Sequence, residues 1–406
     1  MAERRVAITG LGIICALGHN VADFWAALRA GRSGIGPIQS VDLVGIRFQN
    51  AAEVRGYDPA GHFTPSQLDL LDRFAQFALL AAKEAIADAA IEWTPALKAR
   101  TAVVTGSCLG GQLTQDSAFA VLYRQDKTHI HPLIIARVMA NAGASHISMQ
   151  HGLGGPVFTI STACSSANHA IGQAFRMVRH GEADLAITGG SEAPFGYGHL
   201  KAWEAMRVIA PDTCRPFCAD RKGMILGEGG AMLVLEPLDA SRARGARILG
   251  EIVGFGMTSD ANHIIMPAVG GPVRAMRDAI EEAGIRPEQV GYINAHGTGT
   301  PANDPTETAA IREVFGSHAD RLPVSSTKSM HGHALGAAGA LEAVATVLAL
   351  RDGILPPTAN FTTPDPLCNL DVIPNEAREV RAEYALSNSF AFGGLNAVLA
   401  FKALSS

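Results

Sequence analysis

Aromatic residues are scarce in this sequence, and positive charge is not in excess. Phe, Trp and Tyr make up 6% of the 406 residues, and 38 acidic residues outnumber 33 lysines and arginines. Nucleic-acid binding depends on clustered cationic charge, so a formal net charge of -5 argues against it. Wholesale disorder requires low hydrophobicity, and the hydrophobic content of 48% excludes it.

Long apolar runs and paired cysteine motifs are also missing. The most apolar long stretch, residues 336–350, carries Glu342 and is shorter than the roughly 18 residues that a membrane-spanning helix needs. The apolar run at 6–14 is interrupted by a threonine and two glycines, unlike a signal peptide, so we expect a cytoplasmic protein without a membrane span. Cys214 and Cys218 form one close pair with no second pair to complete a zinc site, and we expect no metal or other cofactor.

Glycine is abundant instead, with 43 residues, and short β-branched runs alternate with alanine-rich segments. This alternation is typical of an α/β protein whose sheets are covered on both faces. The charged stretch 239–247 separates two similar series, so we expect two related halves, residues 1–245 and 246–406. The pattern predicts strands at 5–14, 101–106, 156–162, 183–189, 231–236, 248–256, 290–294, 322–326, 385–389 and 396–402, and helices at 73–90, 165–180, 273–283, 306–315 and 337–352.

The segment 156–181 contains the first candidate catalytic residue. An apolar strand runs up to Cys164, and an amphipathic helix follows it directly. A cysteine at a helix N-terminus faces unpaired N–H groups and the positive end of the helix dipole, which favour an anion. We therefore expect the pKa of the Cys164 thiol to be lowered, which favours the thiolate that attacks a thioester carbonyl. This context alone leaves open the alternative of a buried structural cysteine.

Two histidines and a lysine follow the ends of two later strands. His296 leaves the strand at 290–294 in a turn of glycines and threonines, and strand ends are where ligands bind in open α/β sheets. Lys328 and His333 follow the strand at 322–326, and we expect Lys328 to be held by a partner, for which Glu342 is a candidate. The alternative for a histidine in such a turn is a core side chain bonded to a neighbouring carbonyl.

A glycine pair follows Phe392 near the end of the chain. Glycines let backbone N–H groups approach a ligand closely, so an N–H group here and that of Cys164 are candidates for an oxyanion hole. Taken alone, the pair is equally compatible with an ordinary glycine turn.

Taken together, these segments resemble the β-ketoacyl-acyl-carrier-protein synthases, the chain-elongating type II condensing enzymes of the thiolase superfamily. The resemblance covers essentially the whole chain and implies a homodimer with a thiolase-like, five-layered αβαβα fold made of two similar halves. It is carried by four motifs in order, Thr162-Ala-Cys164-Ser-Ser, His296-Gly-Thr-Gly-Thr300, Lys328-Ser-Met-His-Gly-His333 and Phe390-Ala-Phe392-Gly-Gly.

The resemblance also implies a role for each motif residue. Cys164 would accept the acyl group, while His296 and His333 would bind the malonyl thioester carbonyl and support decarboxylation. Lys328 would order the electrostatics and hydrogen bonding around His333. Phe392 would gate the pocket, and its backbone N–H would complete the oxyanion hole with that of Cys164. The implied acyl pocket includes two further residues, Leu109 and Cys108, and Glu342 is a supporting residue.

The implied activity is that of β-ketoacyl-acyl-carrier-protein synthase II. This is the decarboxylative Claisen condensation of a cysteine-bound acyl chain with malonyl-acyl-carrier-protein in fatty acid elongation, and the partner is an acyl carrier protein bearing phosphopantetheine thioesters. One alternative is the same chemistry in a specialised polyketide, aryl-polyene or nodulation-signal pathway. Another is a non-catalytic chain-length partner subunit, against which the intact Cys164, His296 and His333 argue.

The chain departs from the family pattern at the expected docking helix. Residues 64–72 lack the basic side chains that an acidic carrier protein would contact, so docking would rely on other cations or on a specialised carrier. Arg73, Lys201 and Arg207 are the candidate cations.

Two further departures concern the acyl pocket. Cys108 replaces a smaller residue, and Leu395 stands where threonine is common, so both bear on acyl preference. The sequence leaves open the acyl chain length and the presence of a monovalent cation near Glu342 and Asn388.

Overall fold

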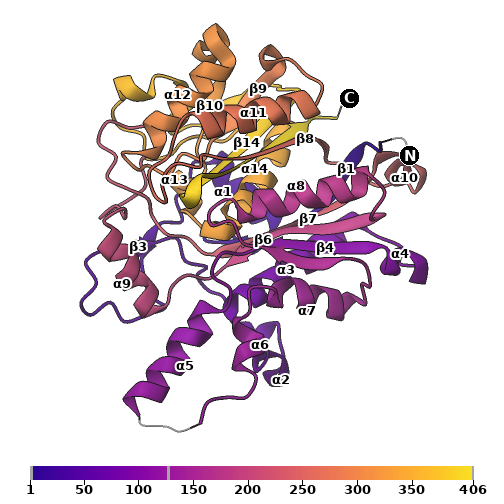
Figure 1. Ribbon diagram of the computed structural model, residues 1–406, viewed down its shortest axis with the longest axis vertical. Helices are drawn as coiled ribbons and strands as arrows, with labels where there is room; N and C mark the ends of the chain where they lie inside the picture. Colours follow the sequence, from indigo (N-terminus) through magenta and orange to yellow (C-terminus); the bar gives the residue numbers. More distant parts are fainter. Residues whose placement is uncertain (1–2, 126–128, 405–406) are drawn as a thin grey trace.

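The computed structural model describes residues 3–125 and 129–404, and in this part of the chain eleven strands form one continuous sheet (Figure 1). Ten of them fall into two sets of five. The first set is β1 (Val6–Cys15), β4 (Thr101–Gly106), β5 (Val157–Ile160), β6 (Leu185–Glu192) and β7 (Gly229–Pro237). The second set is β8 (Gly250–Ser259), β9 (Val290–Asn294), β10 (Pro323–Ser325), β14 (Tyr384–Ala391) and β15 (Leu395–Lys402).

The two sets have the same topology. In each set, the last strand along the chain pairs antiparallel with the first strand on one side and with the fourth strand on the other. The fourth, second and third strands are parallel neighbours in that order. The strand order is β5-β4-β6-β7-β1 in one set and β8-β15-β14-β9-β10 in the other, and β1 pairs with β8 where the sets meet. The prediction of two similar halves is confirmed. The boundary predicted near residue 245 falls between β7 and β8, just after α10 (Leu238–Ala243).

Helices make up the other three layers. α3 (Arg73–Ala89) and α7 (Ala142–His151) cover the outer face of the first set, and α11 (Gly270–Glu282) with α12 (Asn303–Phe315) covers that of the second. α8 (Ser166–Arg179) and α14 (Ala338–Asp352) run between the two sets (Figure 1). Every residue of α14 from Ala338 to Leu350 is buried, as expected for a helix enclosed on all sides. The five-layered αβαβα arrangement is therefore confirmed.

Part of the glycine excess comes from the contact between helices and sheets. A side-chain carbon at Gly12 of β1 would overlap the carbonyl oxygen of Ala81 in α3. At the corresponding place in the second half, one at Gly256 of β8 would overlap the carbonyl oxygen of Ala275 in α11. Only glycine allows these backbones to approach so closely.

The predicted strands and helices are all present, with β4 and β9 at the predicted residues. Four helices of nine residues or more in the described residues were not predicted: α1 (Val21–Arg29), α5 (Gln112–Arg124), α7 and α9 (Tyr197–Met206). α5 buries only Thr114, and α9 buries only Leu200 and Trp203, so neither shows a clear apolar stripe in its sequence. Within the described residues, none of the helices combines the length and the apolar character needed to cross a membrane.

Candidate active site

Cys164 lies in a tight turn between β5 and α8. Ala163 has a φ of 50°, in the left-handed region that side chains rarely adopt. The N–H groups of Ser165 and Ser166 close the turn by donating to the carbonyls of Thr162 and Ala163, each at 3.2 Å. The Ser166 hydroxyl also accepts from the N–H of Thr162 at 2.9 Å. Cys164 is thereby held in the connection after β5, two residues before the first residue of α8.

Burial of the Cys164 thiol reverses the pKa shift predicted from the sequence. The residue is 8% exposed, and loss of solvation raises the pKa of its thiol to about 11. The charge of Lys328 and the backbone N–H groups of Phe392 and Cys164 lower the pKa, but they do not offset burial. The prediction of a lowered pKa is therefore wrong, because the sequence shows the helix start but not the depth of the thiol.

We expect the alkylation rate of Cys164 by iodoacetamide to keep rising between about pH 7 and about pH 10. The thiolate is the reactive form, and its fraction grows roughly tenfold per pH unit below the pKa. The rate is followed by mass spectrometry of the peptide that contains Cys164, with a cysteine in an unstructured peptide as the control, since its profile levels off above about pH 9. A rate for Cys164 that levels off below about pH 8 would contradict the raised pKa.

His296 lies two residues after the end of β9, and Glu307 of α12 binds its backbone. The Glu307 carboxylate accepts from the N–H groups of His296 and Gly297, each at 2.8 Å. Nδ1 of the buried His296 ring lies 3.4 Å from Nζ of Lys328. Because an ammonium group can only donate, Nδ1 is the acceptor and the ring proton is on Nε2. Burial and the charge of Lys328 lower the pKa of His296 well below its usual range, so the ring is neutral near pH 7.

Lys328 begins α13 (Lys328–His331) and is completely buried. Its Nζ donates to the carbonyl of His296 at 2.7 Å and forms an ion pair with Glu342 of α14, so the predicted partner is confirmed. A buried ion pair offsets its desolvation only when its hydrogen bonds are well formed. The hydrogen bonds of Lys328 reach His296 rather than His333, so that part of its expected role is wrong. Its charge does extend to His333, whose pKa it lowers.

His333 is held by its backbone against the segment 225–227. Its N–H donates to the carbonyl of Ile225 at 2.7 Å, and its carbonyl accepts from the N–H of Gly227 at 2.9 Å. The ring is perpendicular to that of His296, with 5.5 Å between ring centres. Burial and the charge of Lys328 lower the pKa of His333 well below its usual range, so this ring is also neutral near pH 7. The site therefore presents two uncharged imidazoles at right angles.

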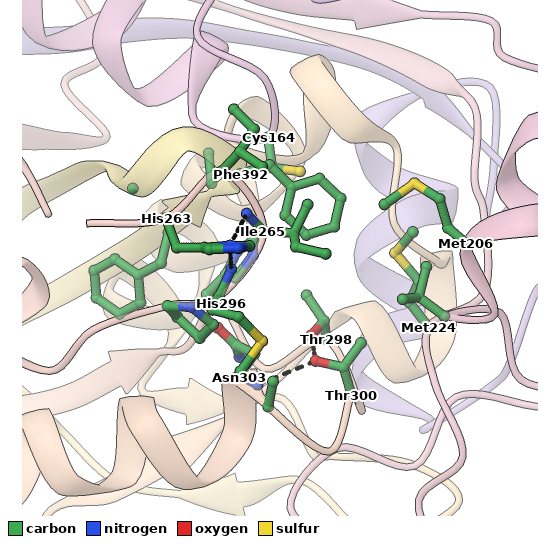
Figure 2. Close-up of a pocket in the computed structure, with 18 of the residues that line it drawn as sticks. Cys164, Met206, Met224, His263, Ile265, His296, Thr298, Thr300, Asn303 and Phe392 are labelled. Carbon is green, nitrogen blue, oxygen red and sulfur yellow. Dashed lines mark hydrogen bonds between the residues drawn. The ribbon is translucent and has the colours of Figure 1, made fainter. Parts of the chain in front are cut away.

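Cys164, His296 and His333 line one cavity of about 280 Å³ (Figure 2). In Figure 2, Met206 and Met224 lie on the other side of this cavity from His296. The hydroxyls of Thr298 and Thr300, which are 2.9 Å apart, add polarity to the wall. Most of the remaining wall is apolar, and it includes Trp203, Ile264, Ile265, Met266, Phe390 and Phe392.

Phe392 begins η6 (Phe392–Gly394), directly after β14. Gly393 has a φ of 81°, and its N–H donates to the carbonyl of Ile264 at 2.7 Å. This turn directs the backbone N–H of Phe392 to the sulfur of Cys164, which the N–H of Cys164 itself also approaches. Two backbone donors therefore act on the thiol of the candidate nucleophile, and their role as an oxyanion hole stays a prediction.

Cys108 and Leu109 are not among the residues that line the open cavity. They pack instead into a hydrophobic cluster that contains Trp203 and Met224, and Phe392 packs against the same cluster. Phe392 therefore borders both the open cavity and the region expected to hold the acyl chain.

Glu192, at the end of β6, fixes the loop that carries Cys108 and Leu109. Its buried carboxylate accepts from the N–H groups of both residues, at 2.8 and 3.2 Å, and from the Ser107 hydroxyl at 2.9 Å. It also accepts from the N–H of Gly336 at 3.1 Å, which ties this loop to the segment that follows His333.

Sequence reasoning missed Glu192, Glu307 and the cavity residues of α9. The two buried carboxylates bind backbone N–H groups, and such contacts leave no motif in the sequence. The place of Thr298 and Thr300 in the cavity wall could have been predicted, because both lie in the motif around His296.

Two of the three cations considered for carrier docking are engaged in other contacts. Arg73 is half-buried and binds the buried Glu228 through two hydrogen bonds of 2.8 and 2.7 Å, which makes it less available to a carrier. Lys201 donates to Glu204 at 2.6 Å. Arg207 is exposed at the end of α9, beside a residue that lines the cavity.

Comparison with known proteins identifies the family. Residues 3–241 match the family model described as "Beta-ketoacyl synthase, N-terminal domain", and residues 249–362 match the one for "Beta-ketoacyl synthase, C-terminal domain". The chain belongs to the β-ketoacyl synthase family. It is therefore an acyltransferase of the condensing type with the thiolase-like fold that the motifs predicted.

Relatives of this synthase are named either nodulation protein E or 3-oxoacyl-[acyl-carrier-protein] synthase 2. Nodulation protein E of Rhizobium sp. (strain N33) is 48% identical over 400 residues, which cover 98% of this chain and 99% of the relative. The 3-oxoacyl-[acyl-carrier-protein] synthase 2 of Coxiella burnetii is 44% identical over 407 residues, 98% of each chain. The solved structure described as "The ishigamide ketosynthase/chain length factor" superposes with a TM-score of 0.94 at 38% identity, covering 100% of both chains.

Proposed function

We propose that this synthase condenses an acyl chain bound to Cys164 with a malonyl thioester of an acyl carrier protein, which yields a β-ketoacyl thioester and CO2. The convergence of Cys164, His296 and His333 on one cavity, with two backbone N–H groups at the thiol, carries this proposal. The nucleophile comes from the half at 1–245 and both histidines come from the half at 246–406. The complete set supports an active enzyme over a non-catalytic chain-length subunit.

In the first step, the sulfur of Cys164 attacks the acyl thioester carbonyl and the carrier thiol departs. The thiol proton of Cys164 ends on the departing carrier sulfur, so the exchange of thioesters is balanced. The N–H groups of Cys164 and Phe392, which both act on the thiol, would bind the negative oxygen of the tetrahedral intermediate. This covalent step divides one difficult condensation into two easier ones.

In the second step, the malonyl thioester loses CO2, and the electrons of the broken C–C bond form an enolate on the thioester oxygen. The N–H groups of His296 and His333 would stabilise that oxygen, and each such donor contributes roughly 2.7–4 kcal/mol to transition-state stabilisation. The carbanion carbon then bonds to the acyl carbonyl carbon, and Cys164 leaves as thiolate. Lys328, Glu342 and Glu307 would keep His296 oriented through the contacts described above.

The acyl chain is proposed to pass Phe392 and lie against Leu109 and Cys108. These two residues pack in the cluster that Phe392 also packs against, and they do not line the open cavity. Phe392 therefore acts as the gate in this proposal, and Cys108 and Leu109 form part of the wall that selects the chain.

We further propose that the enzyme works in the cytoplasm with a dedicated carrier in a specialised signal-molecule pathway. The nodulation protein E relatives share 46–48% of their residues with this chain, and the synthase 2 relatives share 40–44%. The absence of cations at 64–72 and the partial burial of Arg73 also support a dedicated carrier, because they remove contacts that an ordinary acidic carrier would use. Fatty acid elongation is the competing assignment.

We expect kcat/KM to be about tenfold or more higher with malonyl loaded on a carrier from a nodulation-type pathway than on the fatty-acid carrier, a difference of roughly 1.4 kcal/mol in docking. The measurement is the rate of β-ketoacyl product formation at low carrier concentration. Malonyl on free pantetheine is the control that removes docking. Equal kcat/KM for the two carriers would instead assign the enzyme to fatty acid elongation.

The first half also presents a surface that we propose pairs with a second copy of the chain. β5 is at the end of the strand order and has a strand neighbour on one side only among the described residues. Phe158 of β5 is exposed, as are apolar side chains on the nearby helices: Phe119 and Tyr123 of α5, Ile135 of α6 (Ile134–Val138) and Met149 of α7. An unpaired strand edge beside apolar surface is a favourable place for a two-fold interface.

We expect Phe158→Asp to convert a dimer into a monomer, because a carboxylate at the centre of this interface would be buried without a partner. Analytical ultracentrifugation gives the mass of the particle in solution. Leu367→Asp is the matched control, since Leu367 is exposed elsewhere, in η5 (Pro366–Cys368). A wild-type protein with the mass of one chain, or a Phe158→Asp variant with the mass of two, would contradict this interface.

A further inference from the structure

The ring of Phe392 stacks on the indole of Trp203. The two ring centres are 6.2 Å apart and the ring planes are inclined by 28°. Trp203 lies on α9, is 9% exposed and lines the same cavity as Cys164 and Phe392. Its side chain therefore connects a surface helix to the aromatic ring beside the nucleophile.

His199 holds the indole of Trp203 in place. The two residues are four positions apart on α9, so they lie on the same face of the helix. The indole N–H of Trp203 donates to Nε2 of His199 at 2.7 Å. The two rings also meet edge to face, with 5.9 Å between centres and an angle of 84°. Because an indole N–H can only donate, Nε2 of His199 is the acceptor and the imidazole proton is on Nδ1.

The helix that carries this pair is itself anchored. Lys201 donates to the carbonyl of Gly45 at 2.7 Å, and the Tyr197 hydroxyl donates to the carbonyl of Val44 at 3.1 Å. These contacts attach the outer side of α9 to the loop at 42–47. An aromatic ring held by an anchored helix and a hydrogen bond resists rotation better than a ring held by packing alone.

The position of Phe392 matters in two ways. Its N–H group is one of the two donors at the Cys164 sulfur, so a shift of η6 would move a donor of the oxyanion hole. Its ring also packs against the cluster that contains Cys108 and Leu109 while lining the open cavity. In the proposed function, a chain passes this ring to reach Cys108 and Leu109, and the stacked indole opposes displacement of the ring.

We propose that His199 and Trp203 form a brace that holds the Phe392 ring closed and thereby sets which acyl chains reach the pocket behind it. Trp203 is then a positioning residue for Phe392, and His199 is a positioning residue for Trp203. This inference rests on the proposed function, in which the acyl chain passes Phe392. It adds a determinant of specificity on α9, where neither residue touches the reacting atoms.

The brace is tested first without any substrate, by alkylation of Cys164. Iodoacetamide is the small reagent, and N-phenyl iodoacetamide is the bulky one, whose ring we expect to press against the Phe392 ring beside Cys164. We expect His199→Ala and Trp203→Ala to raise the ratio of bulky to small alkylation rates about fivefold, within the range that an aromatic contact represents. His199→Gln, whose side-chain oxygen accepts the indole N–H, should stay within about twofold of the wild-type ratio.

A matched control separates the brace from general destabilisation. Trp25→Phe removes another indole hydrogen bond, the one from Trp25 to Asp352 at 2.6 Å, outside the cavity. We expect it to leave the alkylation ratio unchanged. Trp203→Phe keeps an aromatic ring but loses the N–H, so it provides a folded variant in case alanine is not tolerated, and we expect it to raise the ratio at least about twofold. Ratios within twofold of wild type for His199→Ala, Trp203→Ala and Trp203→Phe would overturn the brace.

The second measurement uses acyl thioesters of different chain length. Weakening the brace should speed transfer of long acyl chains to Cys164 relative to short ones, by a factor similar to that found for alkylation. If wild-type protein forms no acyl adduct while the alkylation ratios change as expected, the brace stands and the proposed condensation fails. If the adduct forms but neither ratio changes in His199→Ala, the condensation stands and the brace fails.

Discussion

Cys164→Ala is expected to form no covalent acyl adduct and to lose condensation by roughly 10³-fold or more, as observed when a catalytic nucleophile is removed from other enzymes. Cys164 is the only cysteine among the residues that line the cavity with His296 and His333, so the cavity wall offers no second thiol. The two N–H donors remain after the substitution, but no nucleophilic atom is then left beside them. Intact-protein mass spectrometry after incubation with an acyl thioester measures the adduct.

The control for this variant is Cys15→Ala, which removes a buried thiol of β1 that does not line the cavity. It should form the acyl adduct at the wild-type rate. An adduct in Cys164→Ala at the wild-type level would place the acyl group on another residue and would refute the assignment of the nucleophile. Malonyl decarboxylation without condensation is compatible with the assignment, because both imidazoles remain in Cys164→Ala.

The layered fold was accessible from sequence because its signals are local. Apolar β-branched runs identify the strands, and the alanine-rich segments identify the helices that pack between or outside them, such as α14. α5 and α9 were not accessible, because only Thr114 is buried in one, and Leu200 and Trp203 in the other. The repeated strand order of the two halves is a long-range property, and the sequence indicated it only through the similar series on either side of residue 245.

The candidate site was predictable as a set of residues but not as an electrostatic environment. The motifs contain Cys164, His296, Lys328 and His333, and the structure brings them together. Their pKa values depend on burial and on neighbours that come from distant segments, which no motif records. This is why the thiol of Cys164 has a raised pKa although it stands at a helix start, the type of position that lowers it in an exposed cysteine.

The same reasoning explains why neutral histidines suit the proposed mechanism. A protonated imidazole beside the positive charge of Lys328 would add repulsion, and the structure lowers the pKa of both rings. A neutral ring keeps one N–H donor for an enolate oxygen without adding positive charge to the site. Lys328 thus contributes by fixing the proton of His296 on Nε2, which directs the N–H away from the ion pair.

His333→Ala is expected to slow decarboxylation of the malonyl thioester by roughly 10²–10³-fold, the usual effect of losing one donor to a developing oxyanion. Acyl transfer to Cys164 should stay within about threefold of wild type. In the proposed mechanism, the N–H groups of Cys164 and Phe392 stabilise the oxyanion of that step. The two half-reactions are measured separately, as release of labelled CO2 and as the mass of the acyl adduct. This split distinguishes loss of a donor from loss of the fold, which would impair both.

His318→Ala is the matched control for His333→Ala, since it removes a half-buried imidazole that is bonded at 2.9 Å to the carbonyl of Val290 and does not line the cavity. Both half-reactions should proceed at wild-type rates in that variant. If His333→Ala released CO2 as fast as wild type, the enolate would have to be stabilised by His296 alone, and His333 would lose its assigned role. If it instead lost acyl transfer to the same extent as decarboxylation, His333 would act on Cys164 as well, and the separation of the two oxyanion sites argued from the geometry would be wrong.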